Sequence, residues 1–166
     1  TVWSTIDTNT LEYQAAGDWT GMLFAVQAIG SILWAMVIPR FRNVKIAYSL
    51  SLILGGVGFI STYFIHDQYL LAVSFLLIGC AWAAMLALPF TILTNSISGK
   101  NMGTYLGLFN GTICLPQIIA ASIGGVLLSL VGGAQVNMLV LAGILLILGA
   151  ASVFIIKETS AEKADK

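Results

Sequence analysis

Charge is what this sequence has least of. Only 8% of its 166 residues are Asp, Glu, Lys or Arg, against roughly 25% in a typical soluble domain. Between Asp18 and Lys157 the charged side chains occur only in short breaks between long apolar runs, and 58% of all residues are hydrophobic. The seven basic residues are balanced by seven acidic ones, so no basic surface for nucleic acid is expected. These shortages exclude an ordinary water-soluble domain and predict an integral membrane protein.

Residues that carry out catalysis or bind metal are equally scarce. The sequence has two cysteines, Cys80 and Cys114, and one histidine, His66. Both cysteines fall within apolar runs and are interpreted as small packing residues, and no Cys/His cluster has metal-binding spacing. No Ser-His-Asp, Cys-His or paired-carboxylate arrangement can be assembled at membrane depth. The sequence therefore predicts no enzyme activity, no cofactor and no metal site.

Five apolar runs have the length of a transmembrane helix, which needs about 20 residues to cross a hydrocarbon core about 30 Å thick. The runs are continuous rather than alternating, which favours helices over barrel strands. The predicted fold class is all-α, a polytopic membrane helix bundle over residues 19–156. Residues 1–18 are predicted to be an extracytoplasmic loop with the end of a preceding helix, and residues 157–166 a cytoplasmic tail. The predicted spans are residues 19–38, 46–65, 69–93, 102–131 and 136–156.

The breaks between the spans predict how the chain is oriented. Arg40, Arg42 and Lys45 lie in the first break and Lys100 in the third, whereas residues 66–68 contain neither lysine nor arginine. Positively charged loops face the cytoplasm. Because the number of spans is odd, the N-terminus is predicted to lie outside and the C-terminus in the cytoplasm.

Small and polar residues occupy one face of the fourth span. Gly103, Gly107 and Gly111 recur every four residues, and Asn110 and Gln117 fall on nearly the same side of a helix. Small residues permit close helix contact in lipid, so this face is predicted to look into the protein or into a watery cavity. Two amides at membrane depth are costly unless they are hydrogen-bonded. They are candidates for binding a polar ligand, and the alternative is that they only join helices.

Other spans contribute fewer candidates. Gln27 is the polar candidate of the first span. Trp82 lies at mid-depth in the third span, where its indole ring either stacks on a sugar ring or faces lipid. Pro89 and Pro116 each remove a helical hydrogen bond, so the third and fourth helices are predicted to bend there, for packing or gating.

Three predictions concern packing alone. Trp34, near the end of the first span, is predicted to belong to the interfacial aromatic belt, with a polar contact as the alternative. The fifth span is rich in leucine and isoleucine and is predicted to be peripheral. The second span carries a stripe that is predicted to be a helix contact, formed by Ser51, Gly55, Gly58 and Thr62.

Two segments resemble a family of transporters. They are residues 79–90, GCAWAAMLALPF, and residues 102–120, which contain MGTYLGLFN and PQIIA. These motifs resemble the C-terminal half of sugar carriers of the major facilitator superfamily, above all relatives of the bacterial sucrose and maltose proton symporters in the glycoside–cation symporter group. Residues 18–26, with DWTG and FAV, resemble the start of that family's eighth helix. The resemblance implies helices eight to twelve of a twelve-helix carrier whose N-terminal half is missing.

The resemblance also implies a function. It is transport of a small polar solute, a disaccharide, by cation-coupled symport with alternating access across a bacterial cytoplasmic (inner) membrane. The partners would be the lipid bilayer, a sugar, a proton or sodium ion, and the missing N-terminal half. The substrate-binding residues would include Gln27, Trp82, Asn110 and Gln117.

Two alternatives to a coupled carrier stay open. One is a structural or assembly membrane subunit whose polar residues only join helices, and the least favoured is an intramembrane enzyme. No span contains a buried carboxylate or arginine of the kind that carries a proton or sodium ion. If the protein is a symporter, its coupling residues are therefore expected elsewhere in the carrier.

Overall fold

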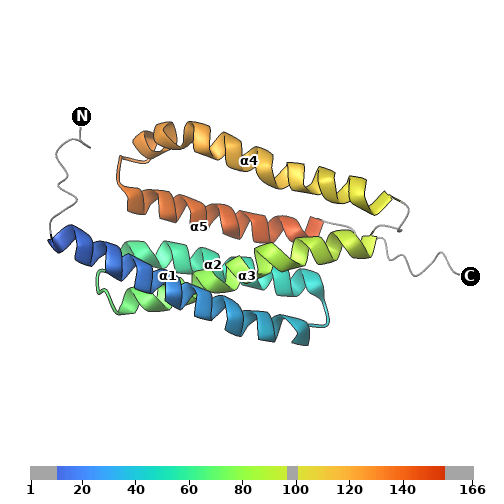
Figure 1. Ribbon diagram of the computed structural model, residues 1–166, viewed down its shortest axis with the longest axis horizontal. Coiled ribbons are helices and arrows are strands. Elements are labelled where there is room, and N and C mark those ends of the chain that lie inside the picture. Colours follow the sequence, from blue (N-terminus) through green and yellow to red (C-terminus); the bar gives the residue numbers. More distant parts are fainter. Residues whose placement is uncertain (1–10, 97–100, 156–166) are drawn as a thin grey trace, which may run out of the picture.

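The computed structural model describes residues 11–96 and 101–155, which form a bundle of long helices (Figure 1). Five helices are long and apolar enough to cross a membrane, and the described residues contain no strand. The predicted all-α membrane bundle is therefore confirmed. The helices are α1 (Leu11–Val37), α2 (Val44–Phe64), α3 (Leu70–Ser96), α4 (Met102–Leu130) and α5 (Gln135–Ser152), with short 3-10 helices at Ile38–Arg40 and Val153–Ile155.

Successive helices run in opposite directions (Figure 1). The connection between α1 and α2 lies at the same end of the bundle as the last turn of α5, and the connections at residues 65–69 and 131–134 lie at the other end, where α1 begins. The five crossings therefore start and finish at opposite ends. Which end faces the cytoplasm stays a prediction, and Lys100 and residues 157–166 lie outside the described residues.

The start of α1 corrects one predicted boundary. Residues 11–18, predicted as part of a loop, form the first two turns of α1 instead. This segment, LEYQAAGD, consists mostly of residues with good helix propensity. Its Glu12 and Asp18 lower the hydropathy, so hydropathy places the span later than the helix begins. Residues 1–10 lie outside the described residues.

Helix α2 is the centre of the bundle and packs on α3 along the predicted stripe. Ser51 is fully buried, and Gly55 lies against the Cβ of Ala81, which leaves no room for a side chain. A Cβ at Gly58 would come within 2.8 Å of the Ser74 carbonyl oxygen. The predicted helix contact is confirmed at Gly55 and Gly58.

Helix α5 packs closely on the other side of α2 with one face, while most of its residues stay at least partly exposed. A Cβ at Gly56 would lie 2.8 Å from the Gly143 carbonyl oxygen, and a Cβ at Gly143 would lie 2.7 Å from the Gly56 carbonyl oxygen. Ser49 also donates a hydrogen bond of 3.0 Å to the Ala150 carbonyl oxygen. Two opposed glycines let these helices meet backbone to backbone, which is how helices associate in lipid.

Helix α1 packs on α3 and is also tied to α2. Ser31 donates a hydrogen bond of 2.9 Å to the Gly79 carbonyl oxygen of α3. The indole nitrogen of Trp34 donates one of 2.8 Å to the Ser51 hydroxyl of α2. Trp34 is thus half-buried and makes the polar contact that was its alternative role. Its place in an interfacial belt stays a prediction.

Helix α4 stands apart from α1, α2 and α3 and lies beside α5 (Figure 1). No residue of α4 is buried. A Cβ placed at Gly103, Gly107 or Gly111 would meet nothing within 4 Å. The structure thus leaves the glycine face of α4 open, and its predicted role in helix packing stays a prediction. A contact with α3 is made by Phe109, whose ring lies edge-on to Phe90 with centroids 4.9 Å apart.

Candidate functional site

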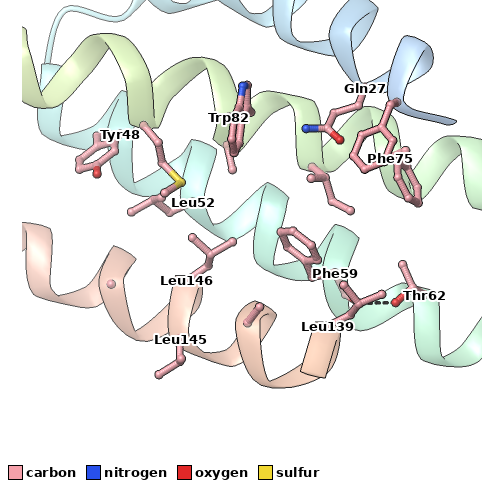
Figure 2. A pocket seen from close by; sticks show the side chains of 16 residues that line it. Gln27, Tyr48, Leu52, Phe59, Thr62, Phe75, Trp82, Leu139, Leu145 and Leu146 are labelled. Atoms are coloured by element: carbon pink, nitrogen blue, oxygen red, sulfur yellow. Dashed lines mark hydrogen bonds between the residues drawn. The ribbon is translucent and has the colours of Figure 1, made fainter. Parts of the chain in front are cut away.

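A cavity of about 600 Å³ lies on the face of α2 between α3 and α5, with α1 at one end (Figure 2). Its lining is mostly aromatic and aliphatic. In Figure 2, Gln27, Phe75 and Trp82 lie on one side, Leu139 and Leu146 of α5 on the other, and the side chains of α2 between them. The side chains from α2 are Tyr48, Leu52, Phe59 and Thr62.

Few polar groups reach this cavity, and they differ in whether they have partners. The Thr62 hydroxyl donates a hydrogen bond of 2.7 Å to the Phe59 carbonyl oxygen. The Gln27 amide and the Trp82 indole N–H make no hydrogen bond within the described residues. Trp82 is 55% exposed. The cavity therefore presents an amide and an indole ring whose hydrogen-bonding groups are unused in this part of the chain.

The close approach of α1 and α3 holds Gln27 and Trp82 about one helical turn apart. The backbone oxygen of Gln27 lies so close to Gly79 that a Cβ there would clash with it. Trp82 follows Gly79 by three residues, which places it one helical turn further along α3. Gln27 and Trp82 also line a neighbouring cavity of about 480 Å³ together with Ser31. The structure thus brings two of the predicted site residues together.

The other two predicted site residues lie on α4, away from this cavity. Asn110 and Gln117 are exposed, and neither lines the cavity between α3 and α5. Their amides also make no hydrogen bond within the described part of the chain. The structure does not join the four residues into one site.

Pro89 and Pro116 lie in unbroken helices. Helix α3 continues through Pro89 and α4 continues through Pro116. Pro89 lines a further cavity of about 450 Å³, to which α4 contributes Phe109. Their predicted roles in bending and gating stay predictions.

Tyr48 is a lining residue that the sequence analysis missed. It lies on α2 one turn before Leu52 and lines both the large cavity and the one beside Pro89. The available signal was the spacing of Tyr48, Leu52 and Phe59, which share a face of α2 beside the serine and glycine stripe.

The lining residues offer contacts for binding a ligand. Apart from Tyr48, the lining of the large cavity has no ionisable side chain. Within residues 11–96 and 101–155, no group of three or more His, Cys, Asp or Glu side chains could hold a metal ion. Ring stacking, shape and a few hydrogen bonds are what these residues offer to a ligand.

These features define a polytopic helical membrane protein with a ligand-sized cavity between its helices. The sequence profile of the Major Facilitator Superfamily matches residues 2–166, and the chain belongs to this superfamily of membrane transporters. The superfamily assignment made from the motifs is confirmed, and a transporter is favoured over an enzyme.

Among curated proteins, the chain is similar to the magnetosome protein MamH of Paramagnetospirillum magneticum (strain ATCC 700264 / AMB-1). The two are 28% identical over 119 residues, which are 70% of this chain and 27% of MamH. The chain therefore matches about a quarter of the length of that relative. No solved structure shows significant similarity to this chain.

Proposed function

We propose that this chain is part of a carrier that moves a small polar solute, a disaccharide, together with a cation by alternating access. Superfamily membership supports transport, and the motifs of the third and fourth spans support a sugar as the solute. Gln27 and Trp82 contribute to the binding site from the cavity wall. Asn110 and Gln117 contribute from α4. The proposed location is a bacterial cytoplasmic membrane, with the N-terminus outside.

The observation that carries this proposal is the free amide of Gln27 beside the Trp82 indole. Gln27 is half-buried, and a hydrogen bond between its amide and a ligand hydroxyl is worth about 0.5–1.5 kcal/mol. The C–H face of a sugar ring packs on an indole, and its hydroxyls pair with the amide. The cavity volume of about 600 Å³ also lies within the range of roughly 300–1,000 Å³ typical of small-molecule sites.

The hydrogen bonds between helices argue against a purely structural role for the amides. Helix joints within the described residues are made by serines and Trp34: Ser31 with Gly79, Trp34 with Ser51, Ser61 with Ser74 at 2.8 Å, and Ser49 with Ala150. The amides of Gln27, Asn110 and Gln117 form no such joints there. Polar residues of this bundle thus fall into two groups, and the amides are the group available to a ligand.

Coupling to a cation is proposed to depend on the rest of the carrier. Asp18 and Asp67 are the acidic residues with described side chains, and both lie near the end of the bundle where α1 begins. No acidic residue lies at mid-membrane depth in the described helices. The carboxylates that bind a proton or sodium ion are therefore proposed to come from helices outside this chain.

Uptake of labelled sucrose and maltose by the full-length carrier tests the proposal. Gln27→Leu is expected to raise KM about tenfold, since one hydrogen bond to a ligand is worth roughly 1.4 kcal/mol. Gln14→Leu, the same change on the exposed side of α1, is the matched control and is expected to leave uptake unchanged. Trp82→Leu is expected to weaken uptake as well. Unchanged KM in both Gln27→Leu and Trp82→Leu would refute the assignment.

The contribution of α4 is tested separately. Asn110→Ala combined with Gln117→Ala is expected to weaken substrate affinity without lowering the yield of folded carrier. A lower yield with unchanged affinity would instead support the alternative in which these amides only join helices.

A further inference from the structure

The basic side chains of the described residues all lie in one short segment. They are Arg40, Arg42 and Lys45, between the last turn of α1 and the first turn of α2, and we call them the basic loop. Asp18 and Asp67 lie toward the opposite end of the bundle (Figure 1). Within the described residues, the end that carries the basic loop therefore has no carboxylate to balance it.

The core holds the basic loop in place. Phe41 and Val44 pack against buried residues of α2 and α3. The residues between and beside them must then point away from the core. Arg40 and Arg42 are exposed, and Lys45 is half-buried. Two apolar anchors thus present the guanidinium groups of Arg40 and Arg42 on the outside of a segment of fixed shape.

Much of the hydrogen-bonding capacity of the two arginines is unused. Arg40 donates one bond of 3.4 Å to the Met36 carbonyl oxygen, out of the five N–H donors of a guanidinium. Arg42 makes no hydrogen bond or ion pair within the described residues. The backbone N–H of Lys45 is bonded to the Asn43 side chain at 2.9 Å. A ligand would therefore be bound by the basic side chains, since the capped start of α2 has fewer free donors to offer.

We propose that the basic loop binds the headgroups of anionic phospholipids. It connects two membrane-spanning helices directly, the first ending at Arg40 and the second starting at Val44, so its side chains lie at the depth of the headgroups. Guanidinium groups bind phosphate oxygens through paired hydrogen bonds. Anionic lipids attract basic residues beside a membrane span by about fivefold in affinity per residue. This interaction is independent of the transported solute and anchors the α1–α2 connection to one leaflet.

Native mass spectrometry of the full-length carrier in detergent tests this proposal, with phosphatidylglycerol and phosphatidylcholine as probes. Detergent micelles have no sides, so the result does not depend on the direction of insertion. The unaltered carrier is expected to bind phosphatidylglycerol more tightly than phosphatidylcholine. Substituting both Arg40 and Arg42 with glutamine is expected to weaken phosphatidylglycerol binding roughly 25-fold and to leave phosphatidylcholine binding unchanged.

Single and control variants keep the test decisive if the double variant does not fold. Arg42→Gln, at an exposed position, is expected to weaken phosphatidylglycerol binding about fivefold, and Arg42→Lys to retain most of it. Asp18→Asn with Asp67→Asn, at the opposite end, is expected not to weaken it. Equal binding of the two lipids, an unchanged affinity in Arg42→Gln, or displacement of the lipid by equimolar inorganic phosphate would overturn the proposal.

Discussion

The contact between α2 and α5 offers a direct test of how this bundle is held together. A methyl group at Gly143 would lie 2.7 Å from the Gly56 carbonyl oxygen and 2.8 Å from a side-chain carbon of Ile60, whereas ordinary contact begins at 3.4 Å. The backbone oxygen cannot rotate away. Gly143→Ala therefore forces the two helices apart by about 0.7 Å.

The expected cost follows from two opposing terms. Overpacking of this kind destabilises a protein by about 1–3 kcal/mol, whereas replacing glycine by alanine in a helix gains about 1 kcal/mol of helix propensity. Gly21→Ala on α1 isolates the first term, because nothing lies within 4 Å of a Cβ at Gly21 and the propensity gain is the same. We expect Gly143→Ala to be less stable than Gly21→Ala by about 1–3 kcal/mol.

The free energy of unfolding can be measured for the purified chain by titration with sodium dodecyl sulfate, followed by far-ultraviolet circular dichroism. The double variant Gly56→Ala with Gly143→Ala gives a stricter test of the contact. Gly56→Ala and Gly143→Ala each require the same separation of α2 and α5, so together they are expected to cost less than the sum of the single changes. Equal stability of Gly143→Ala and Gly21→Ala, or strictly additive costs, would refute the close backbone contact.

Three further predictions use the same measurement. Trp34→Phe removes the indole donor to Ser51 and is expected to lower the free energy of unfolding by about 0.6–1.5 kcal/mol. Gly107→Ala is expected to be neutral or stabilising in this chain, where the methyl meets nothing within 4 Å, but destabilising in the full-length carrier if the glycine face of α4 packs as predicted. Gly132→Ala places alanine at a φ of 92° and is expected to cost about 1–2 kcal/mol, whereas Gly125→Ala, in open space on α4, is expected to cost nothing.

Hydropathy predicted the five helices of this fold because lipid leaves a spanning segment few other conformations. Hydropathy was less accurate at the start of α1, where the chain is helical but less apolar. Residues 11–18 carry Glu12 and Asp18, which lower the hydropathy, yet they continue α1 because their helix propensity is high. Hydropathy therefore located the most apolar part of α1 but not its first two turns.

Packing was predictable only where one helix carried a repeated signal. The stripe through Ser51 and Gly55 recurs along α2, and it does contact α3. Gly143 is not part of such a repeat. Its role in the contact between α2 and α5 is recognisable only once Gly56 is known to lie opposite it. Trp34 likewise needed the position of Ser51 before its N–H could be assigned a partner. Contacts that depend on residues of two helices could not be predicted from the sequence of either helix alone.

The same reasoning explains how much of the site could be predicted. Residue type and depth singled out Gln27 and Trp82 individually, but their shared cavity depends on the closeness of α1 and α3 at Gly79 and of α2 and α5 at Gly143. Helix α5 forms one wall of that cavity. A methyl at Gly143 that moves α5 by about 0.7 Å must therefore also move this wall. Gly143→Ala is expected to change KM for the solute although Gly143 itself does not line the cavity, because helix packing sets the width of the site.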